Sequence, residues 1–339
     1  MTKKLLKQIL PSISNNINTK KIIKNPQLLP LSGKIENTII LCSDISNENK
    51  VIEKFLQIDK EKGAQNYFKV LNNYLDNFSN YILSKKYFSA LIESIEGSQI
   101  VSIFSNIGNT EESLSLETLA YNSIAKALAL SKLQNVFNKR YSKVFTDYRI
   151  IYSFGNGKII KVPAFESTFG ISSGELLMGL VRAKSGAFDR KEFQAIGQAL
   201  ENSKLLNNLN NYYRTSIICT DEVWKLASSS SNNEKFAIRL LDKVRFSQNG
   251  PVTQLYNILG YTKDITRIED EEIEIFNTAI DKYYKKDFAN AGKLFLQANS
   301  LSENNSTALV FANRCKKLIQ NGIKRDWDGI INLEVNNLF

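Results

Sequence analysis

The chain has 339 residues, of which 43% are hydrophobic, so it is long enough for one large domain and a smaller one. It contains no histidine, which excludes Ser-His-Asp and Cys-His catalysis, histidine-ligated zinc and histidine pH switching. The formal net charge is +10, yet the lysines are scattered among Asn and Ile residues, so the pattern does not favour nucleic-acid binding.

No apolar run reaches the roughly 18 residues of a membrane span, and the N-terminal KKLLKQILPSI is too short for a signal peptide. We therefore expect a cytoplasmic protein without a membrane span. Cys42, Cys219 and Cys315 are far apart and form no CxxC pair. We expect them to be small buried side chains in a reducing compartment.

Residues 1–36 are expected to form a short basic helix and a connector, KNPQLLPLSGK. The apolar run TIILCSDIS follows, which indicates a buried strand with Asp44 at its end. From Asn49 to Lys86, apolar residues recur at helical spacing. This predicts two helices, or one helix broken at Gly63.

The stretch from Ile95 to Asn106 has the signature of a β-hairpin. Two apolar runs, LIESI and IVSIF, flank a Glu-Gly-Ser tip, which we expect to present Ser98 beyond the sheet. From Leu116 to Phe137, small and large apolar residues recur at helical spacing, which predicts a closely packed helix.

The middle of the chain predicts strands at YRIIYSF, GKIIKV, FGISSGELLMGLV and TSIIC. Helices are expected from Gln198 to Asn211 and after a cap at Thr220 or Asp221. Together these segments predict an α+β domain with helices over one face of a mostly antiparallel sheet that closes near Tyr256. We expect a chain cut after Gly260 to stay folded.

An acidic linker, RIEDEEIE, is expected to lead into three short helices that end near Leu318. The segment FANAGKLFLQA resembles a tetratricopeptide repeat, in which alanines let paired helices approach closely. So few helices should lean on the preceding domain, a second copy or a partner protein. Phe288 and Phe295 are candidate anchors for a partner, or packing residues of the repeat.

Six segments resemble, in the same order, a class III adenylate/guanylate cyclase catalytic domain followed by a tetratricopeptide-like tail. They are IILCSDIS, EGSQIVSIFSN, FGISSGELLMGLV, KEFQAIGQALENSKLL, RFSQNGPVTQLYNIL and NRCKKLIQNGIKRDWDGI. The resemblance implies a ferredoxin-like (βαββαβ) nucleotidyl-cyclase-type domain over 37–260. It also implies tetratricopeptide-like all-α helices over 271–320 and a C-terminal tail over 321–339.

In that family the ribose 3′-hydroxyl attacks the α-phosphate of ATP or GTP, and two aspartates hold the two metal ions that assist. The resemblance places Asp44 at the first metal position and Ser98 at the second. A neutral hydroxyl is a poor replacement for a carboxylate toward a hard divalent cation. Asp44 is therefore the one candidate for residual metal binding, or else a strand-end carboxylate or helix cap.

The other family positions are changed as well. Ser94 stands where a lysine reads adenine, and Gln194 stands at the position of its partner. Glu201 replaces the asparagine that orients the ribose, and Leu205 replaces the arginine that stabilises transition-state charge. We therefore expect no catalytic residues and no cofactor, with Mg or Mn bound only if nucleotide binding persists.

The resemblance thus predicts a catalytically inactive cyclase-homology protein that works as a regulatory or scaffolding subunit. Family domains pair head to tail, so the expected partner is a protein, either an active cyclase or a second copy of this chain. Two alternatives stay open. One is an active or weakly active cyclase, and the other is a nucleotide-binding sensor without turnover.

Overall fold

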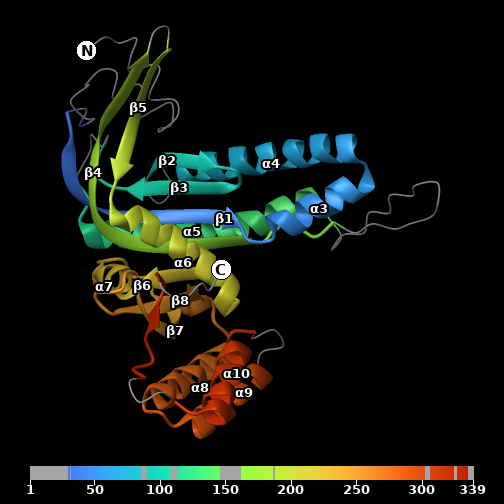
Figure 1. Ribbon diagram of the computed structural model, residues 1–339, viewed down its shortest axis with the longest axis vertical. Helices are drawn as coiled ribbons and strands as arrows, with labels where there is room; N and C mark the ends of the chain where they lie inside the picture. Colours follow the sequence, from blue (N-terminus) through green and yellow to red (C-terminus); the bar gives the residue numbers. More distant parts are fainter. Residues whose placement is uncertain are drawn as a thin grey trace.

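The structure is a computed structural model that describes residues 30, 32–84, 90–107, 113–145, 162–185, 188–301, 306–323 and 327–334. The expected strands YRIIYSF and GKIIKV lie outside these residues, apart from Val162. The fold is a mixed α+β arrangement of one large sheet with helices packed on it (Figure 1).

The first strand ends beside a pair of helices. Strand β1 (Lys34–Ile45) carries Asp44 near its end, and α3 (Glu48–Ile58) and α4 (Lys60–Ile82) follow. The helices separate at Asp59, whose carboxylate accepts a hydrogen bond from the backbone N–H of Lys62 at 2.8 Å. The prediction of two helices is confirmed, whereas the alternative of one helix broken at Gly63 is not, because an aspartate cap starts the second helix four residues earlier.

The strands form one nine-stranded sheet in the order β2-β3-β1-β4-β6-β8-β7-β9, with β5 paired to β4. Neighbours are antiparallel except for the pairs β4–β6 and β7–β9. Figure 1 shows β4 and β5 projecting as a long hairpin beyond the other strands. The remaining bounds are β2 (Leu91–Glu96), β3 (Gln99–Phe104), β4 (Ser167–Ser185), β5 (Phe188–Ile196), β6 (Ile217–Thr220), β7 (Phe236–Arg245), β8 (Thr253–Tyr261) and β9 (Ile331–Asn332).

Helices cover both faces of the sheet, so the expectation of one covered face is wrong. Alternate residues of β1 point to opposite sides, as the two-residue period of a strand requires. Ile39 and Leu41 pack in one core with α4, α5 (Leu116–Arg140) and α7 (Asp221–Ser229). Ile40 and Cys42 pack in another core with the start of α6 (Gln198–Tyr213).

Close approach of α6 to the sheet depends on Gly170 of β4. A Cβ atom at this position would lie 2.2 Å from the backbone oxygen of Ser203 and 2.3 Å from the backbone nitrogen of Asn207. Any side chain here would push α6 off the strand. This glycine therefore helps to set where α6 presents its side chains at the candidate site.

The tail consists of α8 (Arg267–Tyr284), α9 (Phe288–Leu301) and α10 (Ser306–Asn321). The predicted acidic linker RIEDEEIE is instead the beginning of α8. A capping box starts this helix, in which Thr266 and Glu269 each bond to the other's backbone N–H. Acidic residues in a first turn also suit the positive end of a helix.

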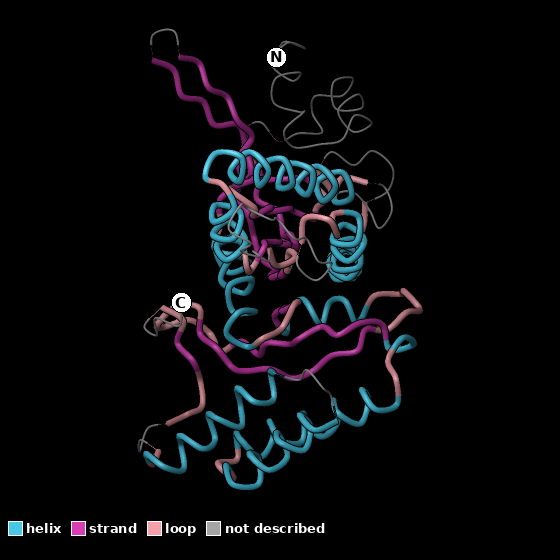
Figure 2. The backbone as a smooth tube through the Cα atoms, turned by 90° about the vertical axis from the view of Figure 1, so that its right-hand side faces the viewer, coloured by secondary structure: helices cyan, strands magenta, loops and turns pink. Residues whose placement is uncertain are grey.

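The tail and the second half of the sheet share one hydrophobic core (Figure 2). Leu241 of β7 and Leu255 of β8 are fully buried in the same cluster as Phe276, Phe295 and other tail residues. The premise that the domain before Gly260 closes its own core is therefore wrong, because a chain cut there would expose this face of the sheet. Phe288 and Phe295 are buried, 7% and 0% exposed, and therefore pack inside the molecule rather than anchor a partner.

Two further expectations concern buried cysteines and membrane spans. All three cysteines are free and buried, as predicted. In the part of the chain that the structure describes, no helix has the length and apolar character needed to cross a bilayer.

Candidate functional site

The β2–β3 hairpin brings Ser98 to the end of β1. Gly97 adopts φ of 62°, a conformation that glycine takes without strain, and it turns the chain between the two strands. Strand β3 then pairs with β1 in a register that sets Ser43 opposite Ile100. Ser98 is only 2% exposed. The expectation that it extends beyond the sheet is wrong, because its hydroxyl turns inward to Asp44.

The Asp44 carboxylate is surrounded by hydrogen-bond donors. The Ser98 hydroxyl donates to Asp44 Oδ1 at 2.5 Å, and the backbone N–H of Ile45 donates to the same oxygen at 2.8 Å. The side-chain amide of Gln99 reaches Asp44 Oδ2 at 3.4 Å. Neutral donors thus use both lone pairs of Oδ1 and approach one lone pair of Oδ2, so a metal ion would have to compete with them.

Burial raises the pKa of the Asp44 carboxyl above its ordinary value, and the hydrogen bond from Ser98 offsets part of this rise. The neighbouring negative charge of Glu48 also raises this pKa. No cation is among the main causes of this shift, and the hydrogen bonds that lower the pKa come from neutral donors.

These residues do not fit a divalent cation. Mg²⁺ and Ca²⁺ are bound by several oxygen ligands that point their lone pairs at the ion. Here three N–H or O–H groups point at one carboxylate, and the nearby Glu48 carboxylate accepts a hydrogen bond from Tyr67. Within the described ranges, no group of three or more His, Cys, Asp or Glu side chains is arranged to hold a metal.

A cavity of about 470 Å³ collects three other family positions. Ser94 of β2, Gln194 of β5 and Glu201 of α6 all line it, although they lie up to 107 residues apart in the sequence. Leu205, one turn further along α6, is half-buried and does not line this cavity. The fold therefore gathers three of the four positions into one space.

The lining of this cavity is acidic. Four glutamates line it against a single lysine, Lys204, whose ammonium lies 3.6 Å from the Glu201 carboxylate. Gln194 donates a hydrogen bond to Glu192 at 3.3 Å, so its amide is already engaged. The acidic residues are Glu93, Glu96, Glu192 and Glu201. Such a field disfavours a polyphosphate.

Several residues of the site escaped the sequence reasoning. Gln99 contacts Asp44, and Glu93 and Glu96 add charge to the cavity. The two glutamates could have been noticed in the run ESIEG, directly before the hairpin tip. Glu192 and Lys204 had no local signal, because only the packing of β5 and α6 brings them to the cavity.

No family model and no curated protein matches this sequence. Among solved structures, the chain is similar to the adenylyl cyclase CyaB from P. aeruginosa, with 17% identity, a TM-score of 0.48, and coverage of 70% of this chain and 100% of that one. It is also similar to the guanylyl cyclase Cya2, with 15% identity, a TM-score of 0.44, and coverage of 68% and 95%.

A bacterial light-regulated adenylyl cyclase is similar as well, with 13% identity and a TM-score of 0.49. The match covers 75% of this chain and 60% of that one. These neighbours are adenylyl and guanylyl cyclases. At such identities and scores we infer neither family membership nor function from the likeness.

Proposed function

We propose that this protein is a catalytically inactive relative of the class III nucleotidyl cyclases that acts as a regulatory or scaffolding subunit. One observation carries the proposal: the Ser98 hydroxyl donates to Asp44 Oδ1 at the point where the family resemblance implies two metal-binding carboxylates. This hydrogen bond supports the proposal, because the Ser98 hydroxyl uses a lone pair of the carboxylate and supplies no negative charge to a metal ion.

The arrangement of the strands supports the relationship. The order β2-β3-β1-β4, with antiparallel neighbours, fits the ferredoxin-like βαββαβ arrangement that the resemblance implies. The family positions also converge in space, because Asp44 meets Ser98 while Ser94, Gln194 and Glu201 line one cavity. Positions that are scattered in the sequence thus come together in two groups, which supports the proposal.

The chemistry of the site supports inactivity. Cyclisation requires compensation of the charge on the triphosphate and the leaving pyrophosphate. Leu205 offers no guanidinium, and Glu201 and three other glutamates add negative charge where the nucleotide would lie. Among the described lining residues, the one cation is Lys204, and its ammonium lies 3.6 Å from the Glu201 carboxylate.

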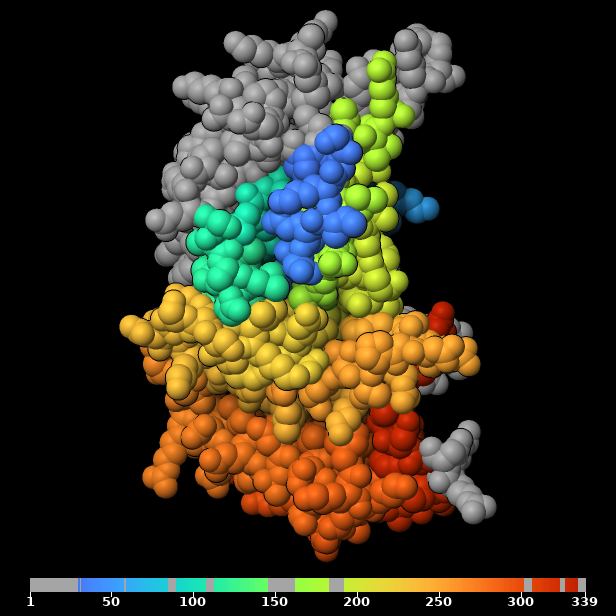
Figure 3. Space-filling view, turned by 90° about the vertical axis from the view of Figure 1, so that its left-hand side faces the viewer, coloured from blue at the N-terminus to red at the C-terminus, as the bar shows by residue number. Residues whose placement is uncertain are grey.

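We propose a second copy of this chain as the partner. An apolar row crosses the three strands at the base of the projecting hairpin, and its members are Ile35, Leu177 and Ile196, which are 64%, 50% and 60% exposed. Ile35 lies opposite Leu177, and Leu177 lies opposite Ile196. Figure 3 shows the start of β1 (blue) beside β4 and β5 (green to yellow-green) at the surface. A continuous exposed row on a sheet marks an interaction surface.

The tail contributes a second surface in this proposal, in the manner of a tetratricopeptide-like helical repeat. Its inner side is occupied by the sheet. A partner would therefore dock on its outer side, where Ile268, Leu296 and Ile319 are more than half exposed.

An activity assay tests the first part. The purified protein should form no cyclic AMP or cyclic GMP above a blank with magnesium or manganese, and Ser98→Asp alone should not restore turnover because Glu201 and Leu205 remain. Turnover that Asp44→Ala abolishes and that Asp76→Ala, an exposed control on α4, leaves intact would instead establish an active cyclase. Nucleotide recovered from the denatured protein, without turnover, would favour a sensor.

Analytical ultracentrifugation tests the partner. We expect a concentration-dependent dimer, and Ile196→Lys should weaken it by more than about tenfold because a charge would be buried in the interface. Val136→Lys is the matched control, since Val136 on α5 is 62% exposed and lies outside the apolar row. A monomer at all concentrations would contradict the dimer and favour an active cyclase as the partner.

A further inference from the structure

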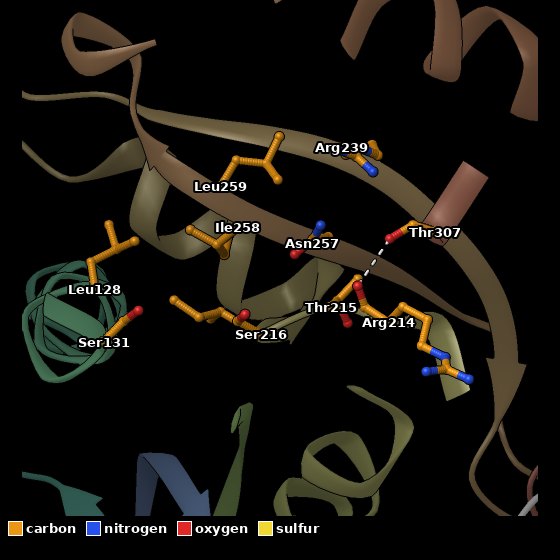
Figure 4. Close-up of a pocket in the computed structure, with 11 residues that line it drawn as sticks. Leu128, Ser131, Arg214, Thr215, Ser216, Arg239, Asn257, Ile258, Leu259 and Thr307 are labelled. Carbon is orange, nitrogen blue, oxygen red and sulfur yellow. Dashed lines mark hydrogen bonds between the residues drawn. The ribbon is translucent and has the colours of Figure 1, made fainter. Parts of the chain in front are cut away.

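A separate cavity of about 250 Å³ lies where the tail meets the sheet, away from the candidate cyclase site (Figure 4). Polar residues from five different elements line it. They include Ser131 of α5, Arg214 at the end of α6, Ser216 before β6, Arg239 of β7, Asn257 of β8 and Thr307 of α10. The proposed cyclase-like function does not use any of these residues.

Asn257 is the unusual member of this set. It is 4% exposed, yet its side-chain carboxamide makes no hydrogen bond to any residue that the structure describes. Figure 4 shows this side chain among the other lining residues, between Arg239 and Ser216. Its amide nitrogen and oxygen are not among the fully buried polar atoms without a partner, because they border the open cavity. The carboxamide therefore faces the cavity as an unused donor and acceptor.

The cavity is suited to negative charge. No carboxylate is among its lining residues, while two arginines are. The Arg239 guanidinium is buried and lies 3.0 Å from Glu272 of α8, so its charge is shared with that partner. Arg214 is exposed and pairs with no described carboxylate, and in Figure 4 its guanidinium extends outward from the cavity. It is long enough to fold over an anion at the opening.

The tail closes one side of this space. Thr307, in the first turn of α10, donates a hydrogen bond to the backbone oxygen of Arg214 at 3.2 Å. The N-terminal end of α10 adds a positive partial charge on the same side. A ligand in the cavity would thus touch the sheet and the tail at once.

We propose that this cavity binds a small oxyanion, an organic phosphate or carboxylate, through the Asn257 amide and the two arginines. The volume admits a group of that size but not a whole nucleotide with its triphosphate. Because the ligand bridges β8 and α10, its binding stabilises the docked tail. The inference is independent of the proposed cyclase relationship.

Calorimetric titration of the full chain with inorganic phosphate, and separately with acetate, tests the proposal at constant ionic strength. We expect saturable binding of at least one of the two anions, and the one that binds identifies the ligand class. Asn257→Asp, which keeps the shape but adds a negative charge, should weaken binding at least about tenfold. Arg214→Gln should weaken it severalfold, and Arg140→Gln, an exposed arginine at the end of α5, should not.

A second variant keeps the test valid if Asn257→Asp, a change at a buried position, prevents folding. Ser216 is exposed, and Ser216→Asp places a carboxylate at the rim of the cavity without disturbing the core. It should also weaken binding at least about tenfold. Hydrogen exchange in the first turn of α10 should slow when the anion is present. Absence of saturable binding by both anions, or binding unchanged by Ser216→Asp, would overturn the proposal.

Discussion

Two aspartates on strands of the same sheet, Asp44 and Asp242, have opposite surroundings. Asp44 of β1 is half-buried, and the described residues that donate hydrogen bonds to it are all neutral. Asp242 of β7 is fully buried, and its Oδ2 lies 2.5 Å from the Arg314 guanidinium of α10. The hydroxyls of Tyr213 and Tyr284 also donate to Asp242, at 2.7 and 2.6 Å.

The difference shows that the contact between the tail helices and the sheet depends on buried charges, whereas the surroundings of Asp44 do not. Burial and the Asp242 charge raise the pKa of both tyrosines, so they stay protonated and continue to donate. A second buried pair, Arg239 with Glu272, joins the same two parts of the chain. Ion pairs thus hold the tail to the sheet, whereas the Asp44 carboxylate is held by hydrogen bonds from neutral donors.

The largest effect should follow from removing the cation at Asp242. Arg314→Met leaves a fully buried carboxylate without its counter-charge, which should lower the free energy of unfolding by about 3 kcal/mol in urea titrations. Lys317→Met, on the exposed side of the same helix, is the control and should change little. The double variant Asp242→Asn/Arg314→Met should recover part of the loss. If Arg314→Met lowers the free energy of unfolding by less than about 1 kcal/mol, the hydroxyls of Tyr213 and Tyr284 are enough to stabilise the Asp242 carboxylate.

A smaller effect is expected when a second charge is added at Asp44. Ser98→Asp sets two carboxylates in contact in a poorly solvated place, which should cost about 2 kcal/mol near pH 7 without metal. The loss should shrink toward about pH 5, because the pair then holds a proton that the unfolded chain has released. Ser98→Asn, which is neutral and similar in size, is the control. Equal losses in the free energy of unfolding for Ser98→Asp and Ser98→Asn would mean that the shape of the side chain at position 98, and not its charge, causes the loss.

The smallest effect concerns the charge of Asp44 itself. The folded-state pKa of this group is raised above 3.8, so stability falls as pH rises from that value through the folded pKa. Asp44→Asn keeps an oxygen that can accept from Ser98 but removes the charge. It should therefore raise the free energy of unfolding by less than about 1 kcal/mol near pH 7, and the gain should vanish near pH 4.

Urea titrations at the two pH values measure this gain, with Asp76→Asn on the exposed side of α4 as the control. A loss of stability in Asp44→Asn at pH 7 would contradict the interpretation. It would show that the negative charge has a stabilising partner that the neutral donors do not account for.

Much of the local structure could be predicted from the sequence, because it depends on neighbours a few residues apart. The β2–β3 hairpin, the strand that ends at Asp44 and the start of α6 at Gln198 lie where the alternation and helical spacing predict them. The predicted helix boundaries were wrong where an N-cap residue sets the first turn of a helix, as Asp59 does for α4 and Thr266 does for α8.

For the candidate site, the family resemblance supplied the positions but not their contacts. That Ser98 turns inward to bond Asp44, and that glutamates dominate the neighbouring cavity, depends on the register of β3 against β1 and on the packing of α6. Neither is encoded in a short stretch of sequence.

The sequence by itself determined the order of the elements and the absence of histidine chemistry, since these depend on composition and local spacing. Only the tertiary structure decided that the tail is part of the same core, that Arg314 meets Asp242 from 72 residues away, and that Asn257 faces an open cavity. These contacts join residues distant in the chain, and their free energy depends on burial and charge partners that exist only after folding.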